Sequence, residues 1–144
     1  MSAVREVMST VTIDGTDARS RRIIVAEDEV LVRLAITEAL RAADFIVYEA
    51  LNGEEAIKPL STFPDVDAVV TDMSMQTPRD GVTVLNFVRA RHPHILVALA
   101  SAHTAEAAHF DALFPKPSDP TRIVEWLNQQ IRTRRMLRRG ADRT

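Results

Sequence analysis

Acidic side chains that follow short apolar runs are the residues in this sequence best placed to do chemistry. Asp72 follows the run at residues 68–71, and Glu27 and Asp28 follow the run at residues 22–26. Such runs are typical of strands buried on both faces of a parallel sheet. Ligands bind outside the carboxyl ends of these strands. A carboxylate there sits on a rigid element, where it could coordinate a metal or act as a nucleophile.

Two further polar side chains follow apolar runs later in the chain. Ser101 comes after residues 95–100, and Lys116 comes after residues 112–114. Clustered carboxylates repel one another unless a cation joins them, and oxygen ligands without His or Cys favour a hard ion such as Mg²⁺. A carboxylate nucleophile with a metal, a lysine and a hydroxyl suits phosphoryl transfer onto Asp72.

Each of these residues, taken alone, has a simpler interpretation. Glu27 and Asp28 could cap the next helix, because acids favour the positive end of the helix dipole. Asp72 could cap a turn, Ser101 could be a turn residue, and Lys116 could be a solvated surface lysine. Their shared position at strand ends favours a common site.

The apolar pattern predicts that strands and helices alternate, which gives βαβ units and a parallel sheet with every strand ending at one edge. In the helix at 29–43, the expected apolar stripe includes Val30, Leu31, Leu34 and Leu40. Only residues 103–110 remain for a fourth helix, which limits it to two turns. The expected strands are 22–26, 45–50, 68–71, 95–100 and 112–114, and the other helices are 52–60, 81–91 and one starting at Pro120.

Composition limits the class of protein. The 144 residues are 46% hydrophobic and 26% charged, as in a soluble globular domain. The chain has no cysteine, which excludes disulfides and thiol catalysis. Because no apolar run could span a bilayer, we expect a cytoplasmic protein without membrane association.

Charge divides the chain into parts. We expect a flexible extension at 1–20, one domain at 21–131, and a basic tail at 132–144 with six arginines and one aspartate, although the net charge is −2. The tail is too short for a fold that reads DNA sequence. Contacts to phosphates and self-association as a homodimer both stay open.

Four motifs in the same order resemble those of response-regulator receiver domains of two-component signalling. They are Ile-Ile-Val-Ala-Glu27-Asp28-Glu29, Val-Val-Thr-Asp72 with Gly81 downstream, Ala-Leu-Ala-Ser101-Ala, and Phe-Pro-Lys116-Pro117. The resemblance covers about residues 21–131. It implies an α/β, flavodoxin-like, doubly wound fold with five parallel strands in the order 2-1-3-4-5, here with a shortened fourth helix.

The resemblance also implies a role for each motif residue. Asp72 would accept a phosphoryl group from a histidine kinase or phosphotransfer protein, and Ser101 and Lys116 would contact that group. The chain would then be a single-domain switch rather than an enzyme, acting by binding an output protein that the sequence does not identify. The implied Mg²⁺ ligands are Asp72, Asp28, Glu27 (mainly through water) and the backbone carbonyl of Ser74, and the bond between Lys116 and Pro117 would be cis.

Departures from the family pattern keep two alternatives open. The position three residues before the lysine is usually aromatic but is Leu113 here, and the loop after Asp72 is one residue longer than in many members. Leu113, together with the shortened fourth helix, favours an interaction module that does not depend on phosphorylation. A phosphatase with an aspartyl nucleophile would need a second acid where Ser74 stands.

Overall fold

Five parallel strands form the centre of the computed structural model, which describes residues 21–63, 65–103 and 105–142. The strand order β2-β1-β3-β4-β5 confirms the predicted flavodoxin-like topology. The flexible extension expected at residues 1–20 lies outside the residues that the structure describes. The strands are β1 (Arg22–Ala26), β2 (Ile46–Ala50), β3 (Val66–Thr71), β4 (Leu96–Ser101) and β5 (Ala112–Pro115).

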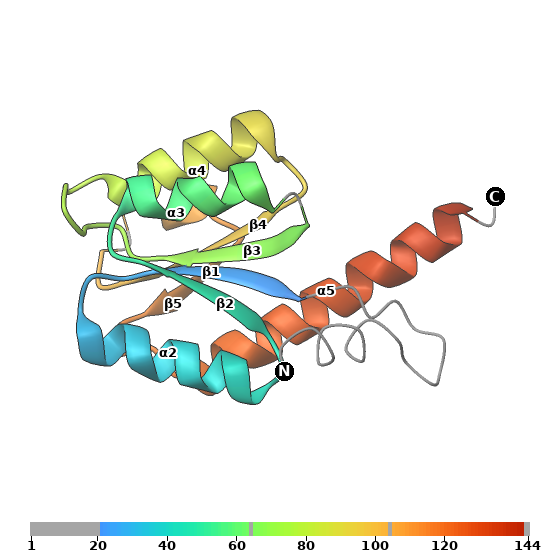
Figure 1. Cartoon of the computed structure of the whole chain (residues 1–144), viewed down its shortest axis with the longest axis horizontal. Helices are drawn as coiled ribbons and strands as arrows, with labels where there is room; N and C mark the ends of the chain where they lie inside the picture. The colour runs from blue at the N-terminus through green and yellow to red at the C-terminus, as the bar shows by residue number, and fades with distance from the viewer. Residues whose placement is uncertain (1–20, 64, 104, 143–144) are drawn as a thin grey trace.

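Four α-helices cover the sheet within the described ranges, with α3 and α4 on one face and α2 and α5 on the other (Figure 1). Side-chain caps fix the starts of two of these helices. The side chain of Asn52 accepts a hydrogen bond from the N–H of Glu55, and that of Asp119 accepts one from Thr121. The helices are α2 (Val30–Ala42), α3 (Gly53–Thr62), α4 (Asp80–Arg91) and α5 (Pro120–Asp142).

Strand β1 shows why the apolar runs are continuous. Ile24 and Ala26 belong to the core on the α3 and α4 side, whereas Ile23 and Val25 belong to the core on the α2 and α5 side. Both faces of the strand are therefore buried, so alternation with polar residues would place polar groups in a core. The predicted burial of this strand is confirmed.

The apolar stripe predicted for α2 was wrong except at Leu40, which is buried as expected. The buried side chains of α2 are Ile36, Thr37 and Leu40, while Val30, Leu31 and Leu34 are 63%, 79% and 45% exposed. Apolar residues occur on more than one side of this helix, so periodicity alone does not define the packed face. Contacts with α5 and β2 decide which side turns inward.

The last third of the chain departs furthest from a regular alternation. A single 3₁₀ turn, Ala107–His109, is the helical element between β4 and β5 in the part of the chain that is described. Helix α5 continues without a break through the arginine-rich segment. No helix among the described residues has both the length and the apolar character needed to cross a membrane.

Candidate functional site

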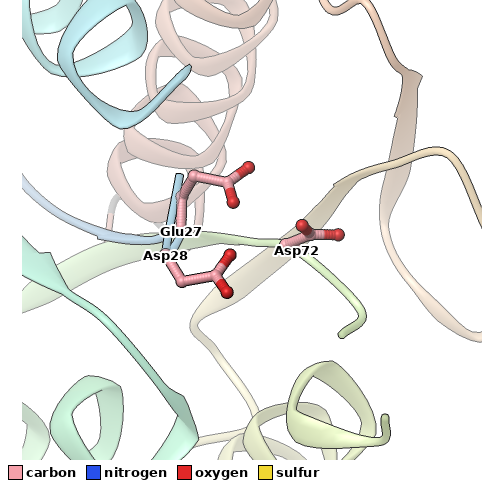
Figure 2. A group of neighbouring side chains, drawn as sticks. All are labelled: Glu27, Asp28 and Asp72. Atoms are coloured by element: carbon pink, nitrogen blue, oxygen red, sulfur yellow. The ribbon is translucent and has the colours of Figure 1, made fainter. Parts of the chain in front are cut away.

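Three carboxyl groups meet at the edge of the sheet where the strands end. Glu27 and Asp28 follow β1, and Asp72 follows β3 (Figure 2). Strands β1 and β3 are neighbours in the sheet. Backbone hydrogen bonds fix this arrangement, because Asp72 N–H donates to the Ala26 carbonyl at 3.0 Å. One oxygen from each of the three carboxylates lies within 4.8 Å of the others. Glu27 and Asp72 are buried and Asp28 is exposed, so the group opens to solvent on one side.

Lys116 joins two of these carboxylates. Its Nζ lies 2.6 Å from Oε1 of Glu27 and 2.7 Å from Oδ2 of Asp72. Lys116 directly follows β5, and its backbone N–H donates to the Ser101 carbonyl at 3.2 Å, which ties this end of the chain to β4. The peptide bond from Lys116 to Pro117 is cis, as expected. One ammonium group therefore links the ends of β1, β3 and β5.

Burial and neighbouring charges shift the pKa values of Glu27 and Lys116. Burial raises the pKa of Glu27 to about 7, and the charge of Asp72 adds to the rise, although Lys116 opposes it. Burial alone would lower the pKa of Lys116, but its hydrogen bonds to Asp72 and Glu27 raise it overall. Lys116 therefore stays protonated at neutral pH and balances negative charge in the site.

The backbone after Asp72 is held tightly against the start of α4. Met73 N–H donates to Oδ1 of Asp72 at 2.7 Å, and Gly81 N–H donates to the Met73 carbonyl at 2.8 Å. A Cβ added at Gly81 would lie 2.6 Å from the Asp72 carbonyl oxygen and 2.8 Å from Cα of Met73. Gly81 is therefore required by this close approach. From the sequence, Gly81 was named only as the glycine downstream of Asp72 in one of the four motifs.

Ser101 and Ser74 are near the carboxylates, but their hydroxyl groups have local partners. Ser101 is fully buried at the end of β4, and its Oγ accepts a hydrogen bond from His103 N–H at 3.0 Å. The hydroxyl of Ser74, two residues after Asp72, donates to the Pro78 carbonyl at 3.0 Å. The structure thus brings Lys116 into direct contact with Asp72 and leaves Ser101 one strand away.

Leu113 and Phe114 lie on opposite faces of β5. Leu113 packs with the core on the α3 and α4 side, and Phe114 packs with the core on the α2 and α5 side. Phe114 is in edge contact with Trp126 of α5, with ring centroids 5.9 Å apart. The two side chains therefore point into different cores, as neighbouring residues on a strand do.

Sequence reasoning missed Arg33. Its guanidinium donates to the Glu27 carbonyl at 2.9 Å and to the Glu49 carboxylate at 3.1 Å, so it braces the turn that carries Glu27 and Asp28. The available signal was an arginine on α2 within two turns of an acidic strand end. Many surface arginines share that placement, so the sequence alone did not single it out.

The residues present fit a hard divalent cation. The donors are carboxylate oxygens from Glu27, Asp28 and Asp72, and no histidine or cysteine belongs to the cluster that the described residues form. Mg²⁺ commonly binds through one or two carboxylates and keeps several waters, which suits a cluster that is open on one side. Its charge would also offset the repulsion among the three acids.

Comparison with known proteins agrees with this geometry. The model of the response regulator receiver domain family matches residues 23–128. The transcriptional regulatory protein PdtaR of Mycobacterium tuberculosis is 34% identical over 95 residues, which cover 65% of this chain and 45% of PdtaR. The sensor kinase CckA of Brucella abortus is 34% identical over 123 residues, which cover 77% of this chain and 13% of CckA. The chain thus spans less than half the length of either relative.

A solved structure shows the same fold. The response regulator receiver domain protein from Clostridium thermocellum superposes with a TM-score of 0.70 at 22% identity, covering 81% of this chain and 98% of that one. The family model covers most of the chain, including the ends of β1, β3, β4 and β5. The chain therefore belongs to the response regulator receiver domain family of two-component systems.

Proposed function

We propose that Asp72 accepts a phosphoryl group from a phosphohistidine and that the modified domain signals by binding another protein. The observation that carries this proposal is the contact of Lys116 Nζ with Oδ2 of Asp72 at 2.7 Å, beside two further acids at the same sheet edge. This contact supports the proposal, because the carboxylate of Asp72 lies directly beside a positive charge. It also leaves the site open on the side of Asp28.

The proposed step is a displacement at phosphorus. A carboxylate oxygen of Asp72 forms a bond to phosphorus, the P–N bond to the donor imidazole breaks, and the imidazole nitrogen keeps the electron pair. Lys116 balances negative charge on the phosphoryl oxygens, and Ser101 supplies a hydroxyl from the next strand. In such transfers, positioning and charge stabilisation supply most of the catalysis.

Asp28 and Asp72 are the proposed direct ligands of Mg²⁺, with Glu27 acting mainly through water and Ser74 contributing its backbone carbonyl. When bound, the ion would clamp a phosphoryl oxygen and neutralise charge that develops during transfer. Arg33 would hold Glu27 and Asp28 in place through the Glu27 carbonyl.

An apolar surface beside the site supports docking of a protein donor. Leu31 and Ala35 of α2 line a hollow together with Lys116, Pro117 and Pro120. The neighbouring side chains of Val30 and Leu34 are exposed as well. Exposed apolar patches of this kind mark interaction sites. We therefore propose that a histidine kinase or phosphotransfer protein docks on α2 with its histidine over Asp72, and that residues 21–131 form the receiver unit.

A phosphorylation-independent interaction module remains the second candidate, supported by Leu113 at the usual aromatic position. In that case a partner would bind equally well whether or not Asp72 carries phosphate. The output partner, and any homodimer, would be found by comparing pull-downs with the two forms.

The test is the intact mass of the full chain after incubation with acetyl phosphate, with and without Mg²⁺. We expect one added phosphoryl group with Mg²⁺ and none with the Asp72→Asn variant. Because acetyl phosphate bypasses donor docking, the experiment isolates the chemistry of the site. Equal uptake by Asp72→Asn would reject Asp72 as the acceptor.

A further inference from the structure

The C-terminal half of α5 extends past the edge of the sheet where the strands begin (Figure 1). Within the body this helix packs through Ile123, Leu127 and Ile131, all buried. Beyond Ile131, the helix places arginines at and beside the continuation of that packed face. We call Arg21, Arg132, Arg135 and Arg139 the arginine cluster, because all four line one hollow of about 240 Å³.

Arg21 is fixed where it enters this hollow. Its guanidinium lies 3.9 Å from the centre of the Phe45 ring and is hydrogen-bonded to Asn128 of α5. Stacking on an aromatic face and a bond to a neighbouring helix limit the positions that an arginine can take. A guanidinium held in this way loses little further freedom when a ligand binds.

The electrostatics around Arg21 are unfavourable for positive charge. Burial, followed by the positive charge of Arg135, lowers the pKa of Arg21, and Asp44 and Asp67 do not fully compensate. Arginine, asparagine, isoleucine and methionine side chains line the hollow, and no acid does so as far as the described chain shows. Arg21 faces the positive charges of Arg132 and Arg135 as well as the negative charges of Asp44 and Asp67, and an anion in the hollow would add negative charge beside the arginines.

The shape of the cluster favours a phosphodiester backbone over a whole nucleotide. The hollow is smaller than the roughly 300–1,000 Å³ typical of small-molecule pockets, and no aromatic ring that could stack a base lines it among the described residues. Arg132, Arg135 and Arg139 run along the helix over about 10 Å, at about 1.5 Å per residue. Arginines in a row can each contact a successive phosphate.

An anionic membrane is the less favoured partner. Met136 and Leu137 are the large apolar side chains exposed on the described part of this half of the helix. Interfacial helices bury a broad apolar face in addition to their basic residues. Two apolar side chains do not provide such a face.

We propose that the arginine cluster binds the phosphate backbone of nucleic acid without reading its sequence. The receiver site and this surface lie at opposite ends of the strands, so the two can be occupied together. The proposal does not rest on phosphorylation of Asp72. It also agrees with the expectation that the chain has no fold for sequence-specific DNA recognition.

The test uses the full chain and fluorescein-labelled 20-base-pair DNA duplexes of two unrelated sequences, followed by anisotropy across a salt series. We expect equal affinity for both duplexes, and a slope of log K against log salt near −3, about −0.9 for each of three or four phosphates. The variant Arg132→Gln/Arg139→Gln should bind several-fold more weakly and lower the size of the slope by about 2. Both side chains are exposed, so folding should be preserved.

The matched control is Arg91→Gln/Arg122→Gln, which removes the same charge from exposed positions on α4 and at the start of α5. This control should bind DNA like the unmodified chain. An equal loss in both double variants would overturn the proposal, because net charge alone would then explain binding. Absence of DNA binding at low salt would overturn it too. So would arginine-dependent binding to phosphatidylglycerol vesicles without binding to DNA.

Discussion

Nζ of Lys116 lies 2.7 Å from Oδ2 of Asp72 and 2.6 Å from Oε1 of Glu27, so one ammonium group joins two buried carboxylates. Removing it with Lys116→Met would leave those carboxylates facing each other. Without Mg²⁺ we expect a loss of about 3 kcal/mol in the free energy of unfolding, the lower end of the range for breaking a buried pair. Urea unfolding with Mg²⁺ omitted measures this loss.

The double-mutant cycle with Glu27→Gln separates this contact from general effects of the substitution. Glu27→Gln removes one of the repelling charges, so Lys116→Met should cost less in that background. Purely additive losses would mean that the contact between Lys116 and Glu27 carries no stabilisation. Mg²⁺ should recover part of the loss in Lys116→Met alone.

Gly81→Ala tests the packing beneath Asp72. The added Cβ would lie 2.6 Å from the Asp72 carbonyl oxygen, so either the strand end or α4 must shift. We expect a loss of about 1–3 kcal/mol, as in other overpacked sites, and slower uptake of phosphate from acetyl phosphate. Gly140→Ala is the control, because a Cβ there meets nothing within 4 Å. That change should stabilise the exposed helix by up to about 1 kcal/mol. Unchanged phosphate uptake in Gly81→Ala would show that Asp72 tolerates the shift.

Leu31→Asp tests the docking surface on α2. Leu31 is 79% exposed and lines the hollow beside Lys116, so a charge there should weaken contact with a protein donor and leave the chemistry intact. We expect transfer from a phosphorylated histidine kinase or phosphotransfer protein to fall at least tenfold, with uptake from acetyl phosphate unchanged. Leu137→Asp, 68% exposed on α5, is the matched control and should behave like the unmodified chain. A parallel fall in both assays would place Leu31 in the site's folding or chemistry instead.

Asp67 makes stability depend on pH at the opposite edge of the sheet. Burial raises the pKa of Asp67 to about 6, although Arg135 lowers it. The unfolded chain has the lower pKa, so the folded state holds the extra proton between about pH 4 and pH 6. The contribution of this residue to stability is therefore greatest at low pH and falls as pH rises through 6.

The comparison with Asp67→Asn isolates that contribution. Between pH 5 and pH 8, the melting temperature of the unmodified chain should fall relative to that of Asp67→Asn. The melting temperatures of the two proteins would change in parallel with pH if the pKa of Asp67 were not raised. Other titrating groups affect both proteins alike and cancel in the difference between their melting temperatures.

The sequence by itself determined the sheet and the polar residues that meet where its strands end. Strands β1, β3 and β4 are buried on both faces over most of their length and therefore contain apolar runs, at residues 23–26, 68–70 and 96–100, each followed by a polar residue. Parallel topology then requires Glu27, Asp28, Asp72 and Lys116 to share one edge. The start of α5 was equally readable, because Asp119 followed by Pro120 is a local signal that needs no partner.

Only the tertiary structure decided which way α2 faces and what braces the site. Helix α2 carries apolar residues on two sides, and packing against α5 and β2 left Leu31 at the surface rather than in the core. Arg33 reaches Glu49 of β2, and Arg21 reaches Asn128 of α5, only after segments that are apart in the sequence come together. Local sequence encodes propensity and period, whereas these contacts depend on the choice among several packings that the same pattern allows.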